Sequence, residues 1–335
     1  MEELVYSTLN QFSTFILFFI VAISLYVLSK GADILVDQAV SLSIRWGVPK
    51  MIIGATIVSL GTTLPEVTVS VIAAINGNPD LALGNAIGSI IADTGLIIGL
   101  AALVGRLPID KNVISRQGRL QLMSGLLLAI VSLPIFSKGV EGRITQPMGF
   151  IFIGLLILYI IITIQWGKKS NGGETSNLQE ERSPLFLQFI KMALGIFLVI
   201  ASSKILIPSV EIVAIRAGIP QSVIAATLVA FGTSLPELVT AITAVKKGHG
   251  ELAVGNIIGA DILNVLFVTG SAAAVTKGGL LVPTDFYKLQ IPTMLIVLVA
   301  FHIFAKNKDN VISKGEGLFL VGMYFVYLIL NYTWI

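Results

Sequence analysis

Two glutamates, Glu66 and Glu237, are the most unusual chemical groups in this sequence, because each lies inside an apolar stretch long enough to span a membrane. A carboxylate at that depth costs roughly 2.5–3.5 kcal/mol on insertion scales. Asp93 adds a third acid in the apolar stretch that follows Glu66. Basic residues are scarce in these stretches, so a bound cation is the natural compensation. The alternative is a glutamate that joins helices and is held by its neighbours.

Each glutamate ends the same short motif, Gly-Thr-Thr-Leu-Pro-Glu at 61–66 and Gly-Thr-Ser-Leu-Pro-Glu at 232–237. Proline lacks an N–H group, so within a helix it frees the carbonyl four residues earlier, here those of Gly61 and Gly232. Irregular backbone is tolerated at membrane depth only where it faces protein or a water-lined cavity. The motifs therefore predict two broken helices that present oxygens to an ion; a proline kink that serves only packing is the alternative. Further hydroxyl and carbonyl donors are those of Thr62, Thr63, Thr233 and Ser234.

A polar stripe follows the first motif. Asn85, Ser89 and Asp93 recur every four residues and so share one helix face. Their counterparts after the second motif are Asn256, Ala260 and Asn264. All these candidates are hard oxygen donors, and the chain has no cysteine and only two histidines. Such a set favours Na⁺ or Ca²⁺ over zinc or copper.

The elements that must position these residues are membrane helices. Of the 335 residues, 55% are hydrophobic and only 12% are charged, about half the usual charged share. This composition excludes an ordinary soluble enzyme, a disordered protein and a nucleic-acid binder. The sequence contains none of the motifs HExxH, GxSxG and GxGD, which would indicate an intramembrane enzyme, so we expect no enzymatic activity. Ten stretches are apolar enough to span a bilayer, at about 13–36, 48–75, 80–104, 120–137, 147–166, 186–209, 219–245, 251–276, 288–305 and 316–334.

An internal repeat relates the two motifs. Residues 47–66 and 218–237 match at 11 of 20 positions with a constant offset of 171, and the matches include Gly, Pro, Thr and Glu. Because each repeat holds five spans, an odd number, the two repeats must insert with opposite orientation, as in many secondary transporters. The sequence thus predicts an all-α polytopic membrane protein with ten transmembrane helices as two inverted five-helix repeats. We place the repeats at 1–166 and 185–335, with a polar linker at 167–184.

The distribution of basic residues predicts the orientation of the chain. Sixteen of the 22 Lys and Arg residues fall on one set of loops if the N-terminus is outside. Because cytoplasmic loops are enriched in Lys and Arg, we expect both termini outside, the 167–184 loop in the cytoplasm, and a multi-pass location in the cell (plasma) membrane. Partners are then the lipid bilayer and transported ions, with no nucleic acid and no cofactor; the sequence leaves the oligomeric state open.

The paired motifs resemble the alpha-repeat signature of the sodium/calcium exchanger branch of the calcium/cation antiporter superfamily, and the resemblance covers nearly the whole chain. It implies a secondary active antiporter that exchanges Na⁺ for Ca²⁺ by alternating access, with the first and sixth spans sliding past the rest. It further implies that Glu66 and Glu237 ligate both ions, and that Thr62, Thr63, Thr233 and Ser234 add hydroxyl or carbonyl ligands. By the same resemblance, Ser59 and Ala230 give backbone oxygen to flanking sodium sites, while Asp93, Asn264 and Ser89 occupy central polar positions.

Three features depart from that family pattern. The acid of the central Asp/Asn pair stands in the first half, at Asp93, where an archaeal relative has it in the second. A serine expected in both halves is replaced by Ala260. Asp261 is an extra acid that could be a ligand, a proton acceptor or a partner for Lys204. H⁺ and K⁺ therefore remain candidate ions, and the alternative function is that of a proton/calcium antiporter.

Overall fold

The computed structural model describes residues 2–136, 141–169, 184–218 and 232–334. The first half consists of α2 (Thr14–Trp46), a broken span of α3 (Lys50–Ile53), η1 (Gly54–Val58), α4 (Ser59–Thr62) and α5 (Leu64–Ile75), a span of α6 (Pro79–Ile91), η2 (Ala92–Ile97) and α7 (Ile98–Val104), then α8 (Lys111–Val131) and α9 (Gln146–Lys169). The second half consists of α10 (Leu185–Arg216), α12 (Leu235–Lys246), a span of α13 (Gly250–Leu263), η5 (Asn264–Thr269) and α14 (Gly270–Val275), then α15 (Gln290–Phe304) and α16 (Lys314–Trp334). Shorter elements are α1 (Glu2–Leu9), η3 (Pro134–Phe136) and η6 (Thr284–Tyr287).

Six of the described helices are by themselves long and apolar enough to cross a membrane. The pair Lys50–Thr62 and Leu64–Ile75, which is bent by 45°, makes a seventh span. The other three predicted spans correspond to α8, α12 and α16. The span predicted at 219–245 lies partly outside the described residues, and α12 is its described helix.

Several helices are longer than the apolar stretches that predicted them. α2 continues past residue 36 to Trp46, where Gly47 in the left-handed conformation (φ 62°) ends it. α8 begins at Lys111 rather than 120, because the Asp110 side chain accepts hydrogen bonds from the first free N–H groups of the helix. α9 runs to Lys169, into the predicted linker, most of which lies outside the described residues. Apolar stretches mark the bilayer core, whereas helices end at their caps.

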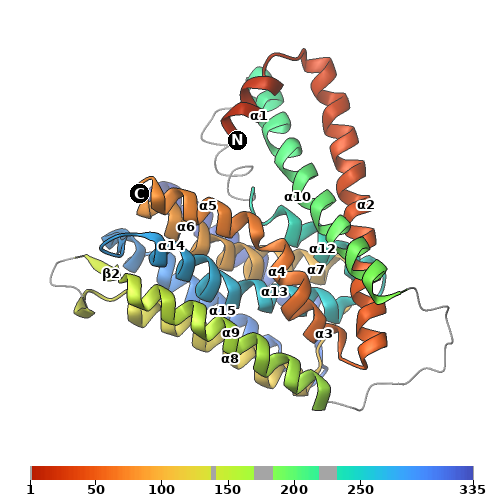
Figure 1. Cartoon of the computed structure of the whole chain (residues 1–335), viewed down its shortest axis with the longest axis vertical. Helices are drawn as coiled ribbons and strands as arrows, with labels where there is room; N and C mark the ends of the chain where they lie inside the picture. Colours follow the sequence, from red (N-terminus) through yellow and green to blue (C-terminus); the bar gives the residue numbers. More distant parts are fainter. Residues whose placement is uncertain (1, 137–140, 170–183, 219–231, 335) are drawn as a thin grey trace.

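The first helices of the two halves lie antiparallel. Arg45, near the end of α2, donates a hydrogen bond of 3.1 Å to Gln188 near the start of α10. At the other end, Arg216 closes α10 and reaches Thr14, the first residue of α2, at 3.3 Å. In Figure 1 the two helices project from the rest of the molecule as a pair. Because α2 and α10 are the first membrane-spanning helices of their halves, the two halves have opposite orientations.

Four short strands, which the sequence analysis missed, also join the halves. β1 (Leu107–Pro108) pairs antiparallel with β4 (Val311–Ile312), and β2 (Gly142–Ile144) with β3 (Leu280–Val282). Each pair takes one strand from each half. Strands of two or three residues leave too short a pattern to be read from the sequence.

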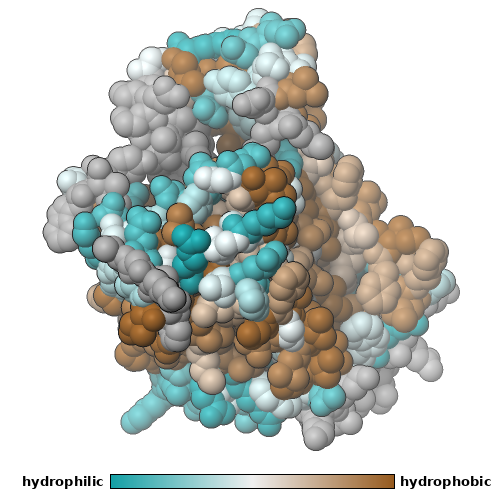
Figure 2. Space-filling model, turned by 60° about the vertical axis from the view of Figure 1, so that its left-hand side comes forward, coloured by the Kyte–Doolittle hydropathy of each residue, from teal (hydrophilic) through white to brown (hydrophobic). Residues whose placement is uncertain are grey.

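The two central spans and the peripheral helices differ sharply in burial. In the most apolar window, 94% of Gly250–Val275 and 78% of Pro79–Val104 is buried, against 28% for α2 and for α10. On the peripheral helices Phe15 and Phe186 are 73% and 77% exposed. Figure 2 shows broad hydrophobic patches over the lower and right-hand parts of one face, with polar side chains at its upper and lower edges and in a group left of its centre. Apolar patches of this extent fit a surface that faces lipid, and the central spans carry the polar stripes.

Candidate ion-binding site

Both glutamates lie in the first turn of a helix that follows a break or a turn in the chain. In the first half α4 ends at Thr62 and α5 begins at Leu64, so that Thr63 lies at the bend and Pro65 in the first turn of α5. In the second half residues 232–234 form a turn and α12 begins at Leu235. Proline is well tolerated in the first turn of a helix, where its missing N–H leaves no bond unmade. The first motif therefore ends one helix and starts another, as its sequence predicts, and the second motif starts α12; the residues before Gly232 lie outside the described part of the chain.

The two glutamates of the motifs and Asp93 are buried without hydrogen-bond partners among the described residues. Glu66, Glu237 and Asp93 are each 1% exposed, and within the described part of the chain none of their carboxylate oxygens has a hydrogen-bond partner. The hydroxyls of Thr63 and Ser234 are buried and unpaired as well. A buried charge is strongly unfavourable unless it is paired. A bound cation would give these unpaired carboxylate and hydroxyl oxygens, which come from both motifs, the partner that they lack.

The two motifs face each other across the boundary between the halves. The Glu66 carboxylate faces Thr233 and lies within electrostatic reach of Glu237 and Asp93. The Glu237 carboxylate faces Thr62 and Thr63 of the first motif. Asp93 in turn faces Ser234. Each of the three acids thus faces hydroxyl groups of the opposite half of the chain.

Asparagines of the polar stripes hold the motifs in place. Asn85 donates hydrogen bonds to the Glu66 carbonyl (3.1 Å) and to Ser70 (2.9 Å), and it accepts one from Thr233 (3.1 Å). Its counterpart Asn256 accepts a hydrogen bond of 3.5 Å from Thr62. Both hydrogen bonds from threonine cross between the halves. The sequence predicted that these asparagines lie on the polar stripes, but it did not predict that they orient the glutamate motifs.

Asp93 and Asn264 occupy equivalent irregular turns. Asp93 lies in η2 and Asn264 begins η5, and both segments are short π-helical turns inside the central spans. Such turns are frequent at functional sites because they displace backbone from the regular helix ladder. The Asn264 side-chain oxygen is buried and has no partner among the described residues. Nothing in the sequence pattern indicates these turns.

The remaining predicted site residues lie in three different settings. The Ser59 carbonyl accepts hydrogen bonds from the backbone N–H of Thr63 (2.9 Å) and from the Thr62 hydroxyl (3.4 Å). Gly61 packs against α10, where a Cβ atom would lie 2.4 Å from Ile196. Ser89 and Gly232 line the cavity described below. Ala230 lies outside the described residues.

Asp261 lies beside the site and has its own partners. Its Oδ2 atom accepts hydrogen bonds from the Thr94 hydroxyl and from the Gln121 amide, the latter at 2.6 Å. The structure does not show the pairing with Lys204 that the sequence suggested, because the Asp261 Oδ2 atom is bonded to Thr94 and Gln121 and its Oδ1 atom has no partner among the described residues. Thr94 and Gln121 were missed by the sequence analysis, since only tertiary packing brings them to Asp261.

A cavity of about 850 Å³ leads to the motifs. Asn85, Ser89, Gly232 and Thr233 line it where it meets the site. Tyr6 of α1 and the α10 side chains Lys204 and Glu211 also line it. The cavity therefore connects the candidate site to the face of the molecule that carries the N-terminal helix.

Carboxylates alone do not make a metal cage here. Within the described ranges, no three Asp, Glu, His or Cys side chains are grouped closely enough to hold a metal ion. Any cation at the site would therefore need hydroxyl, amide and backbone oxygens beside the glutamates. Ca²⁺ accepts such mixed oxygen sets with flexible geometry.

Comparison with known proteins places this arrangement in a family. The sequence model of the family described as "Sodium/calcium exchanger protein" matches residues 16–165 and 187–333. The inner membrane protein YrbG of Escherichia coli (strain K12) is 32% identical over 92% of this chain and 95% of its own length. The sodium/calcium exchanger MaX1 of Methanosarcina acetivorans is 28% identical over 93% of this chain and 97% of its own. A structure of the sodium-calcium exchanger NCX_Mj soaked with 10 mM Na⁺ superposes with a TM-score of 0.80 at 24% identity, covering 95% of this chain and 99% of that one.

These matches confirm the sequence-based fold class, an all-helical polytopic protein with about ten membrane spans in two repeats. They also confirm that the protein is a membrane cation exchanger and not an enzyme, since the family consists of transporters. Because the family model matches most of the chain, this protein belongs to the sodium/calcium exchanger protein family.

Proposed function

We propose that this protein exchanges Na⁺ for Ca²⁺ across the cell membrane by alternating access. One observation carries the proposal: Glu66 and Glu237, one from each half, are buried with unpartnered carboxylates that face hydroxyls of the opposite motif. Leaving two anionic groups in this state without a cation would be costly. The names of the relatives MaX1 and NCX_Mj, both called sodium/calcium exchangers, support the same pair of ions.

The proposed ligand set mixes several kinds of oxygen. Glu66, Glu237 and Asp93 supply carboxylates, and the Asn264 amide completes the central position. The hydroxyl and backbone oxygens come from Ser59, Gly61, Thr62, Thr63, Ser89, Ala230, Gly232, Thr233 and Ser234. Ca²⁺ takes six to eight oxygens, a number that this set can reach without a cage of acids.

Competition for shared ligands would couple the two fluxes. If Ca²⁺ and Na⁺ use the same carboxylates, the site cannot hold both full loads at once. An empty anionic site resists burial in the low-dielectric membrane interior, whereas a neutralised one can be occluded. The site therefore changes sides only when loaded, and the protein exchanges one ion for the other.

The proposed membrane orientation puts the cavity outside. Both termini face the exterior, the 167–184 loop is cytoplasmic, and the repeats at 1–166 and 185–335 insert in opposite directions. The peripheral pair α2 and α10 moves relative to the central spans to expose the site alternately on the two faces. In this orientation the described conformation is open to the outside.

A proton/calcium antiporter is the second candidate, and Asp261 is the observation that favours it. This fourth buried acid lies within electrostatic reach of Asp93, so a proton bound or released there would change the charge of the site. Uptake of Ca²⁺ driven by protons would follow if one of these acids carried a proton through the cycle.

The test is Ca²⁺ uptake into proteoliposomes loaded with Na⁺, with K⁺ or with acid. We expect Ca²⁺ uptake into Na⁺-loaded vesicles only. Ca²⁺ uptake into acid-loaded vesicles without Na⁺ would establish the proton/calcium alternative instead. Absence of uptake under all three conditions, from protein that is folded by size-exclusion chromatography, would overturn both.

A further inference from the structure

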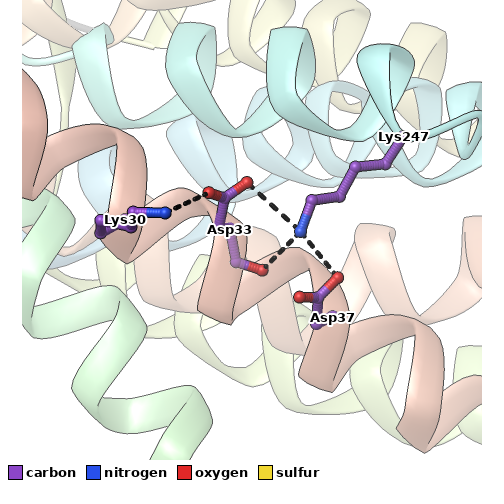
Figure 3. Close-up of polar contacts among 4 residues, drawn as sticks. All are labelled: Lys30, Asp33, Asp37 and Lys247. Atoms are coloured by element: carbon purple, nitrogen blue, oxygen red, sulfur yellow. Dashed lines mark hydrogen bonds and ion pairs between the residues drawn. The ribbon is translucent and has the colours of Figure 1, made fainter.

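A lysine at the end of α12 is held by two aspartates of α2. The Lys247 ammonium lies 2.8 Å from the Asp37 carboxylate and 3.2 Å from that of Asp33, and it also donates to the Asp33 carbonyl at 3.3 Å. Figure 3 shows the lysine reaching from its own helix to lie between the two acids. Asp33 and Asp37 are four residues apart and so share one face of α2. Lys30, on the same helix, lies 3.8 Å from Asp33.

Lys247 carries a positive charge at neutral pH. Burial lowers the pKa of Lys247, but the nearby carboxylates of Asp37 and Asp33 outweigh it and leave the pKa above its ordinary value. The ammonium therefore stays protonated at neutral pH. Helices α2 and α12 pack directly against each other. Among the described residues, the ion pairs of Lys247 with Asp33 and Asp37 are the only ones between these two elements.

The cluster lies on the opposite side of the site from the cavity. Pro236, in the first turn of α12, lines the cavity, whereas Lys247 follows the last residue of that helix, roughly 16 Å farther along. On α2, Asp33 lies roughly 28 Å along the helix from Thr14, the end next to the cavity-lining part of α10. The ion pairs thus join α2 to α12 at the ends of these helices that lie away from the cavity.

The repeat shows that this contact has no equivalent on the cavity side. The offset of 171 relates Asp33 to Lys204 and Lys247 to Asn76. Lys204 lines the open cavity, and Asn76 is exposed at the end of α5. The structure therefore has an ion-paired contact on the side away from the cavity, and the cavity itself lies at the related place on the other side.

We propose that Lys247, Asp33 and Asp37 form an ionic latch that holds α2 against α12 and favours the conformation open on the cavity face. The latch rests on the alternating access of the proposed function, but not on which ions are exchanged. Breaking it lowers the population of the cavity-open state. The apparent affinity for ions then falls on the cavity face and rises on the other, because apparent affinity scales with the competent fraction.

Cysteine labelling measures this population directly. The sequence contains no cysteine, so Ile207→Cys, in the cavity wall, provides a single reporter. In nanodiscs without Na⁺ or Ca²⁺, we expect Lys247→Met to slow its reaction with an impermeant maleimide about two- to five-fold, the range for partly exposed ion pairs. Lys246→Met is the matched control, since this neighbouring lysine is exposed and forms no described ion pair. Asp33→Asn with Asp37→Asn should reproduce the slowing, and 1 M salt should weaken the difference from the parent.

Equal labelling rates in Lys247→Met and Lys246→Met would overturn the latch. If Lys247→Met does not fold, the double aspartate variant answers the same question. Restored labelling when Lys247→Asp is combined with Asp37→Lys would support a direct ion pair, and failure to restore it would count against one. Labelling needs no transport, so this result is independent of whether Na⁺ drives Ca²⁺ uptake.

Discussion

The Thr233 hydroxyl donates a hydrogen bond of 3.1 Å to the side-chain oxygen of Asn85, so the second glutamate motif is bonded to the polar stripe of the first half. The same asparagine donates to the backbone carbonyl of Glu66. One side chain therefore orients both motifs at once. This cross-link connects two motifs that are 171 residues apart in sequence.

Asn85→Ala should lower Ca²⁺ affinity about 10- to 100-fold, because residues that orient ligands typically contribute that much to metal affinity. Calorimetric titration of the purified protein with Ca²⁺ measures the effect. Asn76→Ala, an exposed asparagine at the end of α5, is the control and should bind as the parent does. Unchanged affinity in Asn85→Ala would show that the cross-link is dispensable.

Much of this site could be predicted because its signals are local. The Pro-Glu motifs indicate helix breaks, and the spacing of Asn85, Ser89 and Asp93 indicates one helix face. The partners of Asp261 could not be predicted, since Thr94 and Gln121 come from other spans. The π-helical turns at Asp93 and Asn264 and the extra length of α2 also left no pattern of apolar residues. Motifs and spacings within one span can be predicted from the sequence, whereas contacts between different spans cannot.

Gly255→Ala should destabilise the protein by about 1–3 kcal/mol, as overpacking does in other cores. A Cβ atom there would lie 2.0 Å from the Met51 carbonyl oxygen, and backbone of α3 cannot move aside as a side chain can. Gly88→Ala is the matched control, because its Cβ atom would meet nothing within 4 Å. Thermal unfolding followed by fluorescence should show a lower midpoint for the first variant only; equal midpoints would contradict the close packing of α3 on α13.

Gln121→Leu should destabilise the protein more than Gln117→Leu, although both glutamines are buried on α8. Gln121 donates to the Asp261 carboxylate at 2.6 Å, whereas Gln117 donates to the Thr163 hydroxyl at 3.0 Å. Hydrogen bonds to charged groups contribute about 1.5–3 kcal/mol, and neutral ones about 1 kcal/mol. The same thermal assay compares the two variants, and an equal or smaller loss of stability in Gln121→Leu would contradict a charged hydrogen bond at Asp261.

Lys204→Gln should lower the KM for Ca²⁺ on the cavity face, and should lower that for Na⁺ less. The lysine lines the path to the site, and its repulsion of a divalent ion is twice that of a monovalent one in free energy. Lys191→Gln, an exposed lysine near the start of α10, should leave both values unchanged. Initial uptake rates over a range of ion concentrations give the two KM values. Equal changes for both ions would indicate a structural effect in place of an electrostatic one.

The central claim is that Glu66 and Glu237, from opposite halves, share one cation site, and flux through charge-neutral variants tests it most directly. Sodium-dependent ⁴⁵Ca²⁺ uptake should be measured in proteoliposomes for the parent, Glu66→Gln, Glu237→Gln and the control Glu251→Gln, whose acid pairs with Lys50 away from the site. The account predicts that either glutamine variant of the motif abolishes uptake while the control retains it. Uptake near the parent rate in both Glu66→Gln and Glu237→Gln would contradict it.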